Sequence, residues 1–233
     1  MKKTAVLMGL SALCCCIGIG LLTLGGFSFG AAAPTRNTMR TAAATVLTSR
    51  GTTAVRAVSR PKLDVEDDGP LLEQGQAVLT ALAEEDFSAL SHMVHPARGV
   101  TCTPYSTVDP EHDLCFLPDQ IARAEKDESV YLWGFRAGNG GEIGLTIPDY
   151  FRQYVYDADY LHAPEQSVDE VRSSGNALEN VGEVFAGDRF IEYYFPGIDP
   201  GRGQFDWCAL KLVFAPYGER WYLVGLIHSE WVA

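Results

Sequence analysis

The sequence lacks the short motifs that identify a nucleotide, metal or hydrolase site. No glycine-rich phosphate cradle follows a predicted strand, because Gly138–Gly141 is predicted to be the tip of a hairpin. No Gly-x-Ser-x-Gly segment is present, which excludes the nucleophile elbow of α/β-hydrolases. The histidines show neither HxH nor HExxH spacing, the patterns typical of zinc. We therefore expect neither a cofactor nor a metal.

Acidic residues are absent before Asp64, whereas eight basic residues lie between Met1 and Lys62. From Pro70 to the C-terminus the balance reverses, with 10 Lys and Arg against 26 Asp and Glu, a net charge of −16. A domain of that charge repels nucleic-acid backbones and anionic membrane surfaces, so we expect no nucleic-acid partner. The acidity is typical of a soluble exported domain. It would also suit a domain that binds a cation-rich partner or divalent ions.

The N-terminus has the pattern of a targeting segment. Two lysines follow Met1, and Thr4–Phe29 then contains 26 residues without a charge, long enough to span a bilayer. Alanines 31–33 offer a cleavage site, but Pro34 directly follows them. Residues 1–33 are therefore predicted to be either a signal peptide or a membrane anchor. Both interpretations imply an exported domain that contacts the membrane through this segment only.

A linker and one folded domain follow. Residues 34–69 are rich in Thr, Ala, Ser and Arg and have too few large apolar residues to form a core, so they are predicted to be a disordered linker. Residues 70–233 are predicted to be the globular domain. Apolar residues at helical spacing predict a first helix over 70–84, and Asp86 is a suitable N-cap for a second.

The end of the chain predicts a long β-hairpin. Residues 205–215 and 220–231 are rich in β-branched and aromatic residues, and Pro216–Glu219 separates them. Both faces of each strand are apolar, so the hairpin is expected to be central and covered on both sides. Further strands are predicted at 99–105, 114–116, 129–135, 142–145, 167–173, 182–185 and 189–195, and further helices at 118–124 and 146–156. Helices followed by mostly antiparallel strands indicate an α+β fold.

Several short segments resemble a known superfamily. His95-Pro96, Gly99-Val100, Pro104-Tyr105 and the ending 221–231 are similar to members of the nuclear transport factor 2-like superfamily, and most of all to uncharacterised exported bacterial proteins, often lipoproteins. The resemblance covers roughly residues 70–233. It implies a cone in which a curved sheet wraps N-terminal helices around a pocket. It implies no activity, because this superfamily includes isomerases, dehydratases, cyclases and plain binding domains.

The candidate site lies near the end of the predicted hairpin. His228 and Glu230 are two residues apart on a strand, so their side chains share a face. A histidine beside a carboxylate is a candidate acid–base pair, a binding pair, or a histidine that its neighbour merely satisfies. If Tyr217 and Gly218 form the turn, Trp207 lies opposite His228 and Phe205 lies opposite Glu230.

The predicted ligand pocket combines this pair with aromatic residues. Its members are Tyr105, Trp133, Trp207, His228 and Glu230. We expect a non-enzymatic module that binds a small ligand or a protein partner at the outer face of the membrane. The alternative is a small-molecule isomerase or hydrolase type of enzyme with His228 or Glu230 as general base.

Two cysteines suggest a disulfide. Cys102 and Cys115 lie on predicted neighbouring strands, and an exported domain is in an oxidising compartment. A bridge there would stabilise the fold by roughly 3 kcal/mol in the chain-entropy model. Cys208 is expected to be a buried apolar residue of the hairpin.

Overall fold

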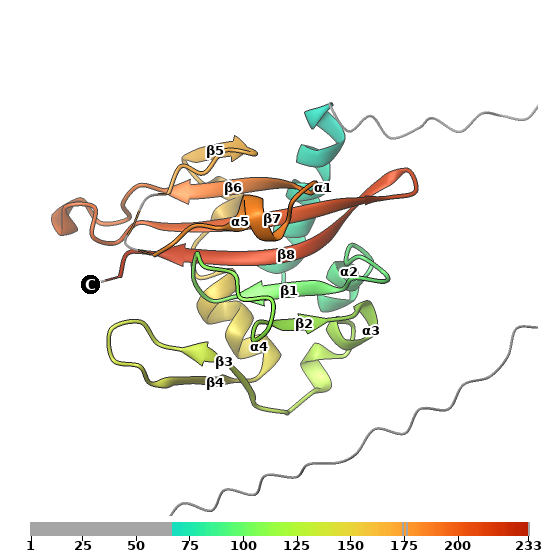
Figure 1. The fold of residues 1–233 in the computed structure, drawn as a ribbon, viewed down its shortest axis with the longest axis horizontal. Coiled ribbons are helices and arrows are strands. Elements are labelled where there is room, and N and C mark those ends of the chain that lie inside the picture. The colour runs from blue at the N-terminus through green and yellow to red at the C-terminus, as the bar shows by residue number, and fades with distance from the viewer. Residues whose placement is uncertain (1–66, 174, 176, 233) are drawn as a thin grey trace, which may run out of the picture. The chain divides into compact units, whose positions relative to one another are not determined.

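The structure is a computed structural model that describes residues 67–173, 175 and 177–232. The predicted targeting segment and nearly all of the predicted linker lie outside the described residues. Within them, none of the helices has the length and hydropathy needed to cross a bilayer. Figure 1 shows the described part as a mixed α+β domain built on one large sheet.

The large sheet has six strands in the order β2-β1-β8-β7-β6-β5. All neighbouring pairs are antiparallel except β1 and β8, which are parallel. The strands are β1 Val100–Thr103, β2 Leu114–Phe116, β5 Glu165–Val168, β6 Arg189–Phe195, β7 Cys208–Tyr217 and β8 Arg220–Glu230. A separate two-stranded sheet pairs β3 Tyr131–Phe135 with β4 Glu142–Leu145. The predicted α+β class with a mostly antiparallel, curved sheet is therefore confirmed.

The C-terminal hairpin occupies the middle of the sheet, as predicted. Strands β7 and β8 are flanked by β6 on one side and β1 on the other. Leu210 and Leu212 of β7 belong to the larger core on one face, whereas Val213 and Ala215 belong to a smaller core on the other. Apolar residues on both faces of these strands therefore reflect burial on both faces.

The predicted register of the hairpin is wrong. Tyr217 pairs with Arg220, so the turn consists of Gly218 and Glu219, and Gly218 has the left-handed φ of 64° that such a turn favours. An irregularity near Val213 shifts the register again. As a result, Leu210 and not Trp207 lies opposite His228, and Cys208 and not Phe205 lies opposite Glu230.

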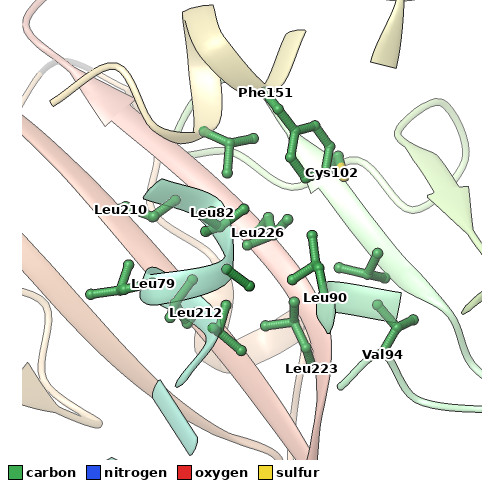
Figure 2. Close-up of a cluster of buried hydrophobic side chains, with 14 of the residues drawn as sticks. Leu79, Leu82, Leu90, Val94, Cys102, Phe151, Leu210, Leu212, Leu223 and Leu226 are labelled. Atoms are coloured by element: carbon green, nitrogen blue, oxygen red, sulfur yellow. The ribbon is translucent and has the colours of Figure 1, made fainter. Parts of the chain in front are cut away.

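Helices cover one face of the sheet. Helix α1, Asp68–Ala83, begins after Asp67, whose side chain accepts a hydrogen bond from Gly69 N, and α2, Phe87–Ser91, begins after the predicted cap Asp86. Gly75 allows α1 to approach β6 closely, because a Cβ there would lie 2.5 Å from Ile191 Cδ1. Figure 2 shows leucines of α1 and α2 packed against leucines of β7 and β8.

Shorter elements complete this layer. They are α3 Pro118–Ile121, η1 Ala124–Lys126, α4 Ile147–Tyr150, the π-helical turn η2 Phe151–Val155 and η3 Tyr160–His162. Thr146 caps α4, as its sequence predicts, by accepting a hydrogen bond from Asp149 N. Asp157 lies two residues after the end of η2 and belongs to the site described below.

The opposite face of the sheet is covered by residues 170–173, 175 and 177–188, which we call the covering segment. This segment contains α5, Val181–Val184, which lies in front of β7 in Figure 1. The predicted strand over 182–185 is therefore wrong. Val181 and Phe185 are four residues apart and both belong to the smaller core, which is the spacing of a helical face. In so short a segment, apolar content alone does not distinguish a helical turn from a strand.

Candidate functional site

The structure separates the five predicted pocket residues into two groups. Tyr105 and Trp133 line a groove beside β3, and Trp133 also stacks on Tyr150 with ring centroids 3.7 Å apart. Trp207 and Glu230 line a different cavity at the ends of β7 and β8. His228 is buried behind this second cavity, with 1% of its surface exposed. The structure therefore does not bring the five predicted residues together in one pocket.

His228 is held by three neighbours. Its Nδ1 lies 3.0 Å from the carbonyl oxygen of Pro104, and because a carbonyl only accepts, Nδ1 is the donor. Its Nε2 lies 3.4 Å from Asp157 Oδ2, an ion-pair distance. The edge of the Tyr154 ring packs against the imidazole at a centroid distance of 5.8 Å. The ring is thus fixed in position by groups from three separate elements.

The Asp157 carboxylate raises the pKa of His228. Burial by itself lowers this pKa, but Asp157 and the Pro104 carbonyl outweigh burial, and Glu230 acts in the same direction. The pKa of Asp157 is lowered in turn. Its burial raises the pKa, but the hydrogen bonds and charge of His228, together with the Tyr160 hydroxyl at 2.8 Å, outweigh that effect. The pair is therefore stabilised as imidazolium and carboxylate.

Asp157 connects the buried histidine to the cavity. Its side chain is 24% exposed, and it lines the cavity that Trp207 and Glu230 also line. Sequence reasoning missed this residue. It follows an irregular π-helical turn and belongs to no motif, so its position opposite β8 depends on tertiary packing.

The cavity at the ends of β7 and β8 has a volume of about 300 Å³. Three carboxylates contribute to its lining: Asp157, Asp206 and Glu230. Phe205 and Trp231 form an edge-to-face pair on it, with ring centroids 5.1 Å apart. The other lining residues are Ile198, Arg202, Trp207 and Cys208. The cavity thus combines negative charge with aromatic surface.

The pKa of the Cys208 thiol is sensitive to this negative charge. Burial, together with the charges of Asp157, Glu230 and Asp206, raises its pKa to about 12, although the nearby Tyr160 hydroxyl acts in the opposite direction. A thiol with that pKa stays protonated and is not a nucleophile near neutral pH. Cys208 is buried, as the sequence predicts.

The other face of the sheet contains a polar cluster that the sequence did not reveal. Lys211 of β7 and its cross-strand partner Glu192 of β6 are both fully buried, and their charged atoms are 3.1 Å apart. Lys211 Nζ also lies 2.8 Å from Glu179 and donates to Ser229 Oγ at 3.1 Å. Two carboxylates and a serine hydroxyl therefore surround the ammonium group of Lys211.

Further hydrogen bonds attach the covering segment to this cluster. Arg172 N and Ser173 N both donate to Glu192 Oε2, and the Ser173 hydroxyl donates to Glu192 Oε1. Ser106 donates to Ser229 at 2.9 Å. Because Lys211 and Glu192 are fully buried and bonded to this segment, we interpret the cluster as the anchor of the covering segment.

The predicted disulfide is not formed. Cys102 pairs with Leu114, whereas Cys115 pairs with Thr101, so the two thiols point to opposite faces of the sheet. Both are free, with Cys102 in the core and Cys115 donating to the Arg98 carbonyl oxygen at 3.1 Å. Cys102 and Cys115 therefore lie on neighbouring strands and one register position apart, but their side chains are on opposite faces of the sheet, which excludes a bond between them.

No family model matches the chain, and no curated protein matches it. Within residues 67–173, 175 and 177–232, no group of three or more His, Cys, Asp or Glu side chains has the arrangement of a metal site. Function is therefore inferred from the geometry of the cavity.

Proposed function

We propose that residues 70–233 form an exported, non-enzymatic binding domain. Residues 1–33 place it at the outer face of the membrane, either as an anchor or as a signal that directs export, and residues 34–69 act as a tether. The cavity at the ends of β7 and β8 receives a small ligand or a side chain of a protein partner. The observation that carries this proposal is the His228–Asp157 pair, in which the imidazole lies behind the cavity and the carboxylate faces it.

The state of His228 favours binding over catalysis. A general base must present a free nitrogen lone pair within hydrogen-bond reach of the substrate. His228 donates from Nδ1 to Pro104, its Nε2 faces Asp157, and its ring is 1% exposed. An imidazole held in this way orients and neutralises Asp157, and it does not reach a molecule in the cavity.

The second candidate is a small-molecule isomerase or hydrolase type of enzyme. It is favoured by one observation: Glu230, the other residue of the predicted pair, lines the cavity directly. In that case Glu230 is the general base, and His228 only positions Asp157. A substrate that is converted by the purified chain, with conversion lost in Glu230→Gln, would favour this candidate over the first.

We further propose that the domain has the cone-like arrangement of the nuclear transport factor 2-like superfamily. Two observations support this: helices α1 and α2 precede the sheet in sequence, and the larger core lies between them and one sheet face. The cavity then lies at one end of the cone, where the central strands β7 and β8 begin and end.

Localisation is tested with the full-length chain in a bacterial host. External protease is added to spheroplasts with intact membranes, and the C-terminal domain is detected with an antibody. We expect the protease to digest the domain while the membrane is intact. In a sample without protease, recovery of the domain with the membranes would indicate an anchor, and recovery in the periplasm would indicate a cleaved signal. Protection of the domain until the membrane is lysed would contradict export.

A further inference from the structure

The cavity at the ends of β7 and β8 has the chemistry of a cation site. We propose that it binds the ammonium or guanidinium head group of an organic cation that carries a short apolar chain. This proposal rests on the binding function proposed above and specifies the class of its ligand. Two sources share the chemistry, a free amine and a Lys or Arg side chain of a polypeptide.

The charge of the cavity favours a cation. Asp157, Asp206 and Glu230 all lie close enough to raise the pKa of the Cys208 thiol between them. Among the described residues that line the cavity, only Arg202 is basic. Its side chain is strongly exposed and its Nε lies 3.8 Å from Asp199, so the charge of Asp199 offsets it. Because His228 neutralises Asp157, the surplus negative charge is that of Asp206 and Glu230. This charge attracts a cation and repels carboxylate or phosphate ligands.

An unsatisfied acceptor also indicates a ligand. Asp206 Oδ2 accepts a hydrogen bond from Asp199 N at 2.7 Å, but Oδ1 is buried without a hydrogen-bond partner among the described residues. Asp206 also lines the cavity. Buried polar groups are nearly always paired, so this carboxylate oxygen indicates a place for a ligand donor.

The apolar side of the cavity favours an organic cation in particular. Phe205 and Ile198 are 63% and 58% exposed, although each is a large apolar side chain. Phe205 packs edge-to-face against Trp231, which presents aromatic faces near the carboxylates. A cation over an aromatic ring is attracted by the negative face of the ring, and an apolar chain covers the exposed surface. An organic cation satisfies the carboxylates and the aromatic rim at once.

A bare metal ion fits the site less well. Among the residues that the structure describes, these carboxylates do not converge as a set of metal ligands. A hard cation also gains nothing from aromatic surface, since it prefers oxygen ligands. The volume of about 300 Å³ accommodates a head group with a few carbon atoms.

Isothermal titration calorimetry on the full-length chain in neutral detergent tests this proposal. The probes are n-butylguanidinium and n-butylammonium, and the matched controls are 1-butanol and pentanoate, which keep the n-butyl chain and change only the head group. We expect both cations to bind with dissociation constants of about 1 mM or below, and the two controls not to bind. Equal binding of 1-butanol or pentanoate, or no binding of either cation, would overturn the proposal.

Substitutions of the cavity carboxylates test whether the cation binds in the cavity. Glu230→Gln and Asp206→Asn are each expected to weaken n-butylguanidinium binding about tenfold, because each removes one charged acceptor. Asp119→Asn and Glu125→Gln change the charge equally at exposed positions outside the cavity and are expected to stay within about twofold. Urea unfolding of each variant shows that it is folded. Equal weakening by the cavity variants and the control variants would mean that the cation binds the acidic surface in general, which would also overturn the proposal.

A third experiment distinguishes a free amine from a polypeptide side chain as the ligand. It also distinguishes failure of the cation site from failure of the proposed binding function. A short peptide with one central arginine that binds about tenfold tighter than n-butylguanidinium would identify a polypeptide side chain, and equal affinity would identify a free amine. If only butanol or another neutral molecule binds, the cation proposal fails while the binding function stands. If mass spectrometry shows that a bound amine is converted to product, the non-enzymatic function fails while the cation site stands.

Discussion

Each face of the sheet buries an ion pair, and the two pairs differ in what surrounds them. Lys211 and Glu192 are both fully buried, and Ser173 and Ser229 complete the polar contacts. On the helix-covered face only the histidine of the His228–Asp157 pair is sealed, and Asp157 opens onto a cavity.

The difference separates a structural role from a binding role. In the Lys211 cluster most donors and acceptors are paired, and its hydrogen bonds hold the covering segment on the sheet. Exposure alone does not distinguish the two pairs, because the side chain of Glu179 beside Lys211 is 26% exposed and that of Asp157 is 24% exposed. The cavity beside Asp157, however, contains a buried carboxylate oxygen of Asp206 that has no partner within the described part of the chain. A cavity with an unpaired acceptor, rather than charge or exposure, therefore distinguishes the face to which we assign binding.

The largest expected loss of stability comes from breaking the Lys211–Glu192 ion pair. Lys211→Met removes the cation and leaves Glu192 buried with its charge unpaired, which should lower the free energy of unfolding by about 3–5 kcal/mol. Urea denaturation followed by circular dichroism measures the loss. The matched control is Lys126→Met on an exposed surface, expected within about 0.5 kcal/mol of the unchanged chain.

Removing both partners sharpens the same prediction. In the double variant with Lys211→Met and Glu192→Met, no charge is left buried, so the loss should be smaller than the sum of the two single losses. Strict additivity of the two substitutions would show that the ion pair does not couple β6 to β7.

The His228–Asp157 pair predicts that the free energy of unfolding depends on pH. The pKa of His228 is raised in the folded chain, so its contribution to stability is complete below the unfolded value of 6.5 and is lost as the pH rises through the folded value. We expect His228→Gln to cost about 1–3 kcal/mol near pH 5, with the difference from the unchanged chain shrinking toward about pH 9.

The difference in the free energy of unfolding between the unchanged chain and His228→Gln isolates the contribution of His228. The pKa of His95 is lowered by burial and by the charge of Arg98, so His95 contributes with the opposite sign, but it does so in both chains and cancels. A difference that grows with pH between about 5 and 9 would contradict the assigned ion pair.

The smallest effect on stability is expected at the rim of the cavity. Phe205→Ala removes a side chain that is 63% exposed, so the free energy of unfolding should change by no more than about 0.5 kcal/mol. The same variant should weaken binding of n-butylguanidinium, because the apolar rim is reduced. A large loss of stability in this variant would show that Phe205 belongs to the core.

Local patterns in the sequence predicted the framework of the fold. The helix after Asp67, the cap at Asp86, the strand over 189–195 and the central hairpin are all confirmed, because each depends on spacing or capping within a few residues. The helical turn at 181–184 was missed, because four apolar-rich residues fit either structure.

The site was predicted only in part, for a physical reason. His228 and Glu230 share a face, as strand periodicity dictates. Their partners come from elsewhere: Asp157 follows an irregular turn, and the register that places Cys208 opposite Glu230 depends on one extra residue in the hairpin. Contacts of this kind are fixed by tertiary packing, and no motif or local pattern in the sequence predicts them.

The protonation of His228 tests the central claim most directly. Selective ¹⁵N labelling of the histidines in the full-length chain, with His228→Gln to assign the signal, gives the titration midpoint of this imidazole by NMR. The account predicts a midpoint above 6.5, and a lower one in Asp157→Asn. A midpoint below 6.5, with a free lone pair on Nε2, would show a neutral imidazole available as a base and would contradict the assignment of this site to binding.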